Sequence, residues 1–126
     1  MSLHSPLGRF FGLLADESGT GHFWGQRLSA IVLAFLGPWF MISLMTMPEL
    51  DHPGTIAFIA APLNNVLLLL LSLTLAYHSY LGVQVVIDDY VHGRRIRVFS
   101  LILSRLAHSM LTVTAVYAIL KIGFGA

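Results

Sequence analysis

Three long apolar runs dominate this sequence, and polar residues interrupt them at only a few positions. The runs cover residues 28–47, 63–87 and 98–122. About 20 apolar residues in a helix cross the hydrocarbon core of a bilayer, so each run is long enough to span, the longer two with some tilt. The pattern therefore predicts an all-α integral membrane protein, a single domain over residues 1–126, whose three transmembrane helices run up, down and up.

The segments around these runs predict short accessory elements. Gly37 and Pro38 lie in the middle of the first run, and proline removes a backbone donor there, so we expect a kink. Residues 49–61 predict a loop followed by a short interfacial helix, after which Pro62 opens the second span. Residues 1–21 are partly apolar but too short to span, and they predict an interfacial N-terminal arm.

The composition agrees with a membrane location and limits the available chemistry. Charged residues make up only 10% of the chain and hydrophobic residues 56%, so lipid has to cover part of the surface. A net charge of +1 gives no indication of nucleic-acid binding. The chain has no cysteine, which excludes disulfides, covalently attached haem and cysteine-held iron–sulfur clusters within it.

The distribution of arginines predicts the orientation. Two arginines flank the start of the first run and three lie in the loop expected at residues 88–97, namely Arg9, Arg27, Arg94, Arg95 and Arg97. The loop around Asp51 has no lysine or arginine. By the positive-inside rule, the N-terminus is cytoplasmic and the C-terminus periplasmic in an inner (cytoplasmic) membrane.

His78 is the only strongly basic side chain in the second run. An ionisable side chain inside a span is costly and usually has a functional partner. On a helix, His78 and Asp89 are separated by only about 20° around the axis and about 16 Å along it. One face thus carries an imidazole inside the membrane and, near the membrane edge, a carboxylate beside the phenol of Tyr90. This arrangement suits a redox cofactor in the bilayer with a proton-handling site above it.

The sequence leaves two interpretations of His78 open. It either hydrogen-bonds a neighbouring helix, or it is an axial haem ligand beside Gly82, which leaves space for a flat macrocycle or a close helix. A second axial ligand could come from His108 on the third span or from a partner subunit. Arg105 and His108 are three residues apart and share a helix face. The favoured interpretation is that both serve in helix packing and in anchoring the helix at the membrane interface.

The residues at the membrane edge also have two interpretations. Tyr90 and Asp89 are either an ordinary helix end with an interfacial tyrosine, or a hydrogen-bond donor to a quinone carbonyl with a proton relay behind it. Arg27 is either a snorkelling anchor or a partner of a haem propionate or quinone. His92 lies at the same predicted membrane level.

The stretch that carries most of these residues, HSYLGVQVVIDDYVHG, resembles the small hydrophobic membrane-anchor subunit of succinate dehydrogenase. His78, Gly82 and the Asp89-Tyr90-Val91 triplet occupy the places of that family's histidine, glycine and Asp-Tyr-Val. The segment HFWGQRLSA resembles the start of the family's first helix, with Arg27 at the basic position.

The resemblance implies that His78 ligates haem b, with the other ligand from a sister membrane-anchor subunit. It implies that Tyr90 hydrogen-bonds ubiquinone and that Asp89 supports its protonation. It also implies docking of an iron–sulfur subunit, and with it a flavoprotein subunit, on the cytoplasmic face. The cluster of Arg94, Arg95 and Arg97 is expected to bind membrane lipids or the iron–sulfur subunit, and Asp88 receives no role.

The expected function is therefore that of a membrane anchor in a succinate:quinone oxidoreductase, respiratory complex II, passing electrons from the iron–sulfur subunit to quinone. This chain lacks a flavin site and clusters, so it would not oxidise succinate by itself. The alternatives are a fumarate reductase anchor and a non-redox membrane scaffold or transporter subunit.

Overall fold

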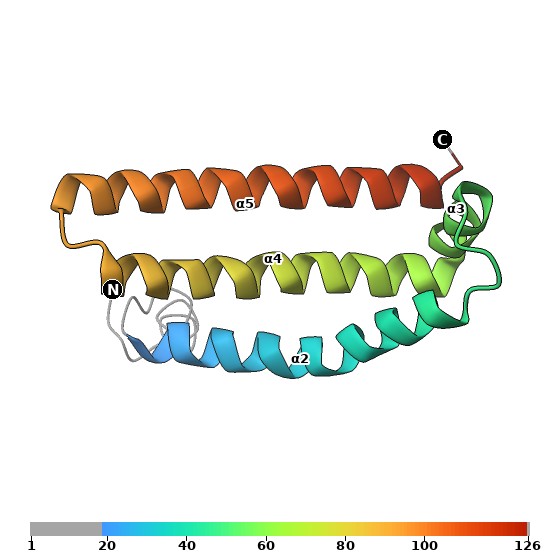
Figure 1. Ribbon diagram of the computed structural model, residues 1–126, viewed down its shortest axis with the longest axis horizontal. Coiled ribbons are helices and arrows are strands. Elements are labelled where there is room, and N and C mark those ends of the chain that lie inside the picture. The colour runs from blue at the N-terminus through green and yellow to red at the C-terminus, as the bar shows by residue number, and fades with distance from the viewer. Residues whose placement is uncertain (1–18, 126) are drawn as a thin grey trace, which may run out of the picture.

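The structure is a computed structural model that describes residues 19–125, all of whose regular elements are helices (Figure 1). Three of the helices are long and apolar enough to cross a membrane. The four helices are α2 (Gly19–Thr46), α3 (His52–Ala60), α4 (Pro62–Tyr90) and α5 (Arg94–Gly123). The predicted all-α fold with three spanning helices is confirmed.

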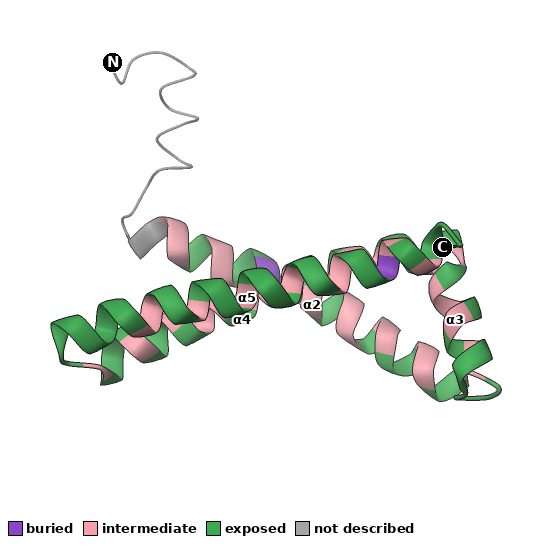
Figure 2. Ribbon diagram, turned by 90° about the horizontal axis from the view of Figure 1, so that it is seen from above, coloured by how far each residue is buried: buried purple, intermediate pink, exposed green. Residues whose placement is uncertain are grey.

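The central helix is α4, which packs against both α2 and α5 (Figure 1). The start of α2, the end of α4 and the start of α5 lie at one end of the molecule, and α3 and the C-terminus lie at the other. The helices therefore run up, down and up. Seen from above, α2 crosses the α4–α5 pair obliquely, so its two ends diverge from them (Figure 2).

The helices extend well beyond the apolar runs, so the predicted boundaries are wrong at several ends. The loop expected at residues 88–97 has shrunk to residues 91–93, because Asp88 and Arg97 lie inside α4 and α5 and form an ion pair across the turn (Nη2 to Oδ1, 2.7 Å). Charged side chains at a helix end can reach water without breaking the helix. The ion pair also gives Asp88 a role that the sequence did not reveal.

The first helix likewise begins at Gly19, not at residue 28, so the last residues assigned to the interfacial arm are helical. Hydropathy detects where a helix enters the apolar layer, and it does not detect where the helix begins. The remainder of the predicted arm, residues 1–18, lies outside the described residues.

The short helix α3 matches the interfacial helix expected after the first loop. Asp51 caps it, since its Oδ1 accepts the backbone N–H of Gly54 at 2.8 Å, and a proline follows in the first turn. Asn65 in α4 then joins three helices, because its Nδ2 donates to the carbonyls of Ile59 in α3 (3.0 Å) and Ile119 in α5 (2.9 Å).

The proline in the first span lies inside α2, which changes direction near its middle, as the expected kink requires (Figure 1). Beyond Pro38, the ring of Trp39 stacks on Phe58 of α3 with centroids 6.1 Å apart. This ring pair joins the second half of α2 to α3, whereas the first half of α2 packs against α4 through Ser29 and His78.

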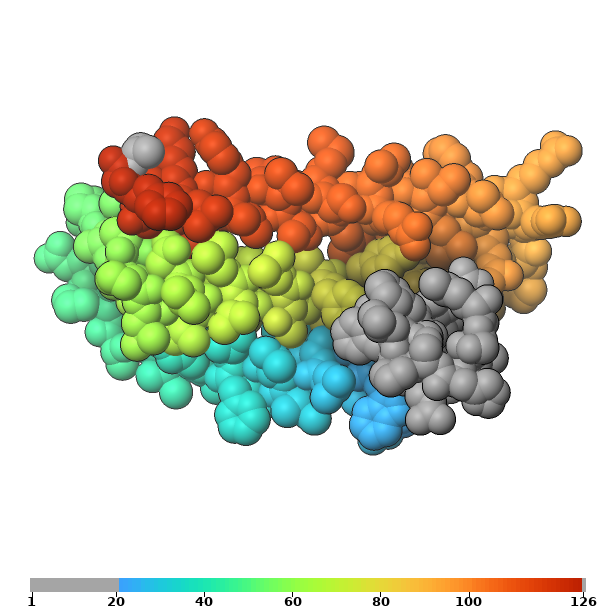
Figure 3. Space-filling view, turned by 180° about the vertical axis from the view of Figure 1, so that it is seen from behind, coloured from blue at the N-terminus to red at the C-terminus, as the bar shows by residue number. Residues whose placement is uncertain are grey.

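Very little of the described chain is buried (Figure 2). In the space-filling view from behind, α5, α4 and α2 lie one above another on the visible face (Figure 3). Within residues 21–125, the only buried side chains are Leu68, Leu81, Ile119 and Ser29. Most large apolar side chains of the three long helices point outward. Such helices cannot form a core by themselves, so lipid or further protein helices have to cover them.

The arrangement of the helix ends predicts which loops share a side of the membrane. Single cysteines replacing Asp51 and Gly125 should react with an impermeant thiol reagent from one side, and a cysteine replacing His92 from the other. The arginines around His92 predict that its side is the cytoplasmic one. Because the chain has no cysteine of its own, only the introduced cysteine can be labelled. Labelling of intact cells reports one side of the membrane, and labelling of inverted vesicles reports the other. Labelling of positions 51 and 92 from the same side would contradict the three-span topology.

Candidate functional site

The centre of the candidate site is a hydrogen bond between the first two spanning helices. Ser29 Oγ in α2 lies 2.9 Å from His78 Nδ1 in α4. Among residues 21–125, Ser29 is the only buried polar residue, and only 5% of its surface is exposed. His78 itself is half-buried. The histidine that the sequence singled out therefore has a specific partner on another helix.

The contacts of Ser29 favour one tautomer of His78. Ser29 Oγ lies 2.7 Å from the carbonyl of Gly25 and 3.0 Å from that of Gln26. A hydroxyl has one hydrogen, and a carbonyl can only accept, so Ser29 donates to the backbone of α2. Ser29 then accepts from Nδ1–H of His78, which leaves a lone pair on Nε2. A neutral imidazole with an unprotonated Nε2 has the lone pair that metal binding requires.

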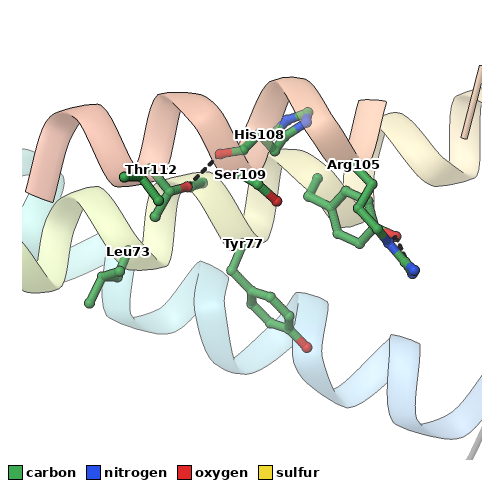
Figure 4. Close-up of a pocket in the computed structure, with 9 residues that line it drawn as sticks. Leu73, Tyr77, Arg105, His108, Ser109 and Thr112 are labelled. Carbon is green, nitrogen blue, oxygen red and sulfur yellow. Dashed lines mark hydrogen bonds between the residues drawn. The ribbon is translucent and has the colours of Figure 1, made fainter. Parts of the chain in front are cut away.

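A glycine allows this close crossing of α2 and α4. A Cβ at Gly25 would collide with the phenolic oxygen of Tyr77 and would lie 3.3 Å from Leu81 Cδ1. Tyr77 points away from α5 toward α2 in the close-up view (Figure 4). Small residues at helix crossings let backbones approach in membranes, and here the approach brings Ser29 within reach of His78.

One turn closer to the Tyr90 end, an open hollow of about 560 Å³ lies between α2 and α4, and we call it the α2–α4 cavity. It is lined by His22, Phe23, Gln26, Arg27, Gly82 and Val85. A Cβ at Gly82 would meet only Gln26 Nε2, at 3.8 Å, so this glycine borders open space. His22 Nε2 and Gln26 Oε1 are buried, and neither has a hydrogen-bond partner among residues 19–125. Buried polar atoms without partners are rare and call for a ligand or water.

His22 was not identified as a site residue from the sequence. The apolar run predicts a helix that starts at residue 28, which places His22 in a flank. With α2 starting at Gly19, His22, Gln26 and Ser29 recur at intervals of four and three residues, so they share one helix face. His22 could therefore have been found in the sequence from the helical spacing of His22, Gln26 and Ser29, which continues through the polar segment before the first apolar run.

The residues at the membrane edge occupy the end of α4 that the sequence predicted, but they form no tight cluster. Asp89 and Tyr90 are exposed, Tyr90 to 78%, and His92 is exposed in the three-residue turn. None of these three side chains hydrogen-bonds another described residue. The guanidinium of Arg27 lies 4.5 Å from the ring centroid of Phe23 at the start of α2. An uninterrupted α4 carries both His78 and Asp89, as their predicted common face requires.

His108 does not lie on the His78 side of α4. Its Nε2 is 3.0 Å from Ser79 Oγ, and its Nδ1 is 2.8 Å from the carbonyl of Ser104. Successive helical residues point about 100° apart, so Ser79 and His78 face different neighbours. Both ring nitrogens of His108 are engaged, and the structure does not bring it together with His78. No group of three or more metal-ligating side chains occurs in the part of the chain described.

The fold and the site together define a membrane subunit with three spanning helices, a histidine held in one tautomer, and an outer surface that needs lipid or other proteins to cover it. A family model described as the succinate dehydrogenase/fumarate reductase transmembrane subunit matches residues 1–120, and this chain belongs to that family.

The similar proteins are named as membrane anchor subunits of succinate dehydrogenase. The chain is 33% identical over 99 residues to the succinate dehydrogenase hydrophobic membrane anchor subunit of Rickettsia bellii (strain RML369-C), covering 79% of this chain and 78% of the relative. It is 30% identical over 115 residues to that subunit of Paracoccus denitrificans, covering 91% and 88%. The succinate dehydrogenase membrane anchor subunit of Reclinomonas americana is 30% identical over 95 residues, covering 73% and 79%. The family resemblance inferred from the His78–Gly93 stretch is confirmed.

Proposed function

We propose that this chain anchors a succinate:quinone oxidoreductase in the inner membrane, supplies one axial ligand to haem b, and forms part of the site that reduces ubiquinone. The observation that carries the proposal is His78, whose Nδ1 lies 2.9 Å from Ser29 Oγ and whose Nε2 has no hydrogen-bond partner among residues 19–125. The names of the relatives favour succinate dehydrogenase over a fumarate reductase anchor. A non-redox scaffold would need no fixed tautomer on a histidine inside the membrane.

The residues around His78 fit a haem. Metal-bound histidines usually donate their second ring nitrogen to a hydrogen-bond acceptor, which fixes the ring and raises its basicity. Ser29 is in that position, and the sister membrane-anchor subunit would provide the other axial ligand. Gly82 leaves room beside the ring, and Arg27 with the unpaired His22 can bind the propionates. Haem in this site would supply a one-electron store close to the quinone.

The quinone site in this proposal lies at the Tyr90 end of α4. Ubiquinone needs two electrons and two protons to become ubiquinol. The electrons arrive from the iron–sulfur subunit, which in turn receives them from the flavoprotein subunit. The exposed phenol of Tyr90 donates a hydrogen bond to a quinone carbonyl and Asp89 relays a proton, while His92 and Arg27 line the same end. This assignment requires the iron–sulfur subunit to dock on the cytoplasmic face, beside Arg94 and Arg95.

The haem assignment can be tested with substitutions at His78 and its partner. His78→Ala should remove or shift the reduced b-type absorbance of the purified complex. Ser29→Ala should leave the histidine in place but remove its acceptor, so haem affinity should fall about tenfold or more and the haem midpoint potential should rise. Haem content, optical spectra and redox titration of the assembled complex measure these effects.

Ser29→Thr is the matched control, because it keeps the hydroxyl and should keep the spectrum, the affinity and the potential. An unchanged spectrum and haem content in His78→Ala would refute the ligand assignment. An unchanged potential in Ser29→Ala, together with haem loss in His78→Ala, would refute only the role of the serine.

The quinone assignment predicts a selective defect in Tyr90→Phe. The variant loses one hydroxyl, and a lost hydrogen bond to a neutral partner costs roughly 0.5–1.5 kcal/mol. Succinate-dependent quinone reduction should therefore fall about twofold to tenfold, and Asp89→Asn should also lower it. Reduction of a soluble dye that takes electrons upstream should stay at the wild-type rate.

The adjacent Asp88→Asn serves as the control for Asp89→Asn, because Asp88 pairs with Arg97 and has no part in the proposed site. It should leave both assays near wild type, since an exposed ion pair contributes little to stability. Wild-type quinone reduction in both Tyr90→Phe and Asp89→Asn would place the quinone elsewhere. Parallel loss in both assays would mean that these residues serve assembly.

A further inference from the structure

A second polar cluster lies between α4 and α5 (Figure 4). It is on a different side of α4 from His78, because Tyr80 is two helical positions, about 200°, away from it. Arg105 in α5 donates from Nη2 and Nε to the phenolic oxygen of Tyr80 in α4, at 3.0 and 3.3 Å. Its guanidinium carbon also lies 5.8 Å from the centroid of the Tyr80 ring. These contacts hold an arginine at a defined place within a membrane-spanning helix.

The charge of Arg105 is not balanced by any acidic side chain of the described chain. The one ion pair among residues 19–125 is that of Arg97 with Asp88. Tyr80 offers a single neutral oxygen, whereas a guanidinium has five N–H donors. Arg105 lies about 16 Å along α5 from its first residue. A cation at such a depth is costly and calls for an anion or a path to the interface.

The cluster sits at one end of a groove with a volume of about 400 Å³. Toward the start of α5 the groove is polar, with Arg105, Tyr80 and Ser109. Farther along, Leu73 and Val113 make it apolar. Residues 105 and 113 are separated by about 12 Å along the helix. Arg105 and Val113 are exposed, so the groove opens onto the outer surface. A charged end followed by an apolar channel matches a molecule with an anionic head and a hydrocarbon chain.

We propose that this groove binds one acidic phospholipid, with its phosphate on Arg105 and an acyl chain running past Ser109 toward Val113. Arginine binds phosphate oxygens through two parallel N–H donors, which is the pairing that the unbalanced guanidinium needs. In Figure 4 the side chain of Arg105 extends toward the Arg94 end of α5, the direction of the nearer membrane surface. A neutral quinone would leave the charge unbalanced. This site is independent of the haem and quinone assignments.

The proposal predicts a specific lipid stoichiometry. The intact complex, purified in a mild detergent and examined by native mass spectrometry, should retain an acidic phospholipid such as phosphatidylglycerol. Arg105→Gln should retain one fewer per copy of this chain. After delipidation, titration with phosphatidylglycerol should show at least a tenfold weaker binding step in the variant, and phosphatidylcholine should not fill the site in the wild type.

Val113→Trp tests the groove without touching the charge, because the added ring would fill the path of the acyl chain. This variant should also lose the lipid. If Arg105 instead served only to hold α4 and α5 together, Val113→Trp would leave lipid binding unchanged. Lys121→Gln, at the far end of α5, is the control for loss of a positive charge and should retain the lipid. Arg105→Lys keeps the charge and should retain it more weakly than wild type.

Three outcomes would overturn the proposal. One is equal retention of acidic phospholipid in Arg105→Gln, Val113→Trp and wild type. Another is equal binding of phosphatidylcholine at the site. The third is a bound quinone, or a crosslink from a photoreactive residue at position 109 to a protein subunit, in place of a lipid.

Discussion

The close crossing of α2 and α4 is the contact on which the site depends. Gly25 allows the helices to approach, and the approach puts Ser29 within 2.9 Å of His78. Ser29 can only accept from the ring, because its own hydrogen is directed to the carbonyl of Gly25 at 2.7 Å. The small residue at position 25 thus leaves room for the Tyr77 phenol and Leu81 beside the serine that contacts His78. A larger residue at position 25 would require the side chain of Tyr77 to move.

The second constraint is that the chain has almost no core of its own. Three apolar residues and one serine are the only buried side chains among residues 21–125. In water so much exposed apolar surface would be unfavourable, but in a bilayer the lipid covers apolar side chains, and helices associate through packing and hydrogen bonds. The polar contacts between helices, at His78, Asn65 and Arg105, therefore carry a large part of the specificity of the fold. The unpaired atoms of His22 and Gln26 indicate where this surface is incomplete.

The sequence predicted the class of fold well, because membrane spans are encoded by long apolar runs. The kink near Pro38, the interfacial helix α3 and the common helix of His78 and Asp89 also followed from local chemistry. The ends of the helices could not be predicted in this way, because an apolar run shows which residues lie in the bilayer and not which residues are hydrogen-bonded as a helix. Because of that error, His22 was not recognised as a site residue. A ten-residue loop was predicted where the structure has a three-residue turn, which the Asp88–Arg97 ion pair closes. Partners across helices could not be predicted either, because they depend on how the helices cross. Nothing in the sequence distinguishes Ser29 from the other serines of the chain until α2 is placed against α4.

The two histidines inside the spans show how one helix presents neighbouring positions to different partners. Both His78 and His108 looked able to bind one metal, but adjacent positions on α4 present His78 to α2 and Ser79 to α5. The side of α4 toward α2 carries the histidine with a free Nε2 and a cavity with unpaired polar atoms, which suits a cofactor shared with another subunit. The side toward α5 carries Tyr80 and an open groove with a positive charge, which suits the surrounding lipid.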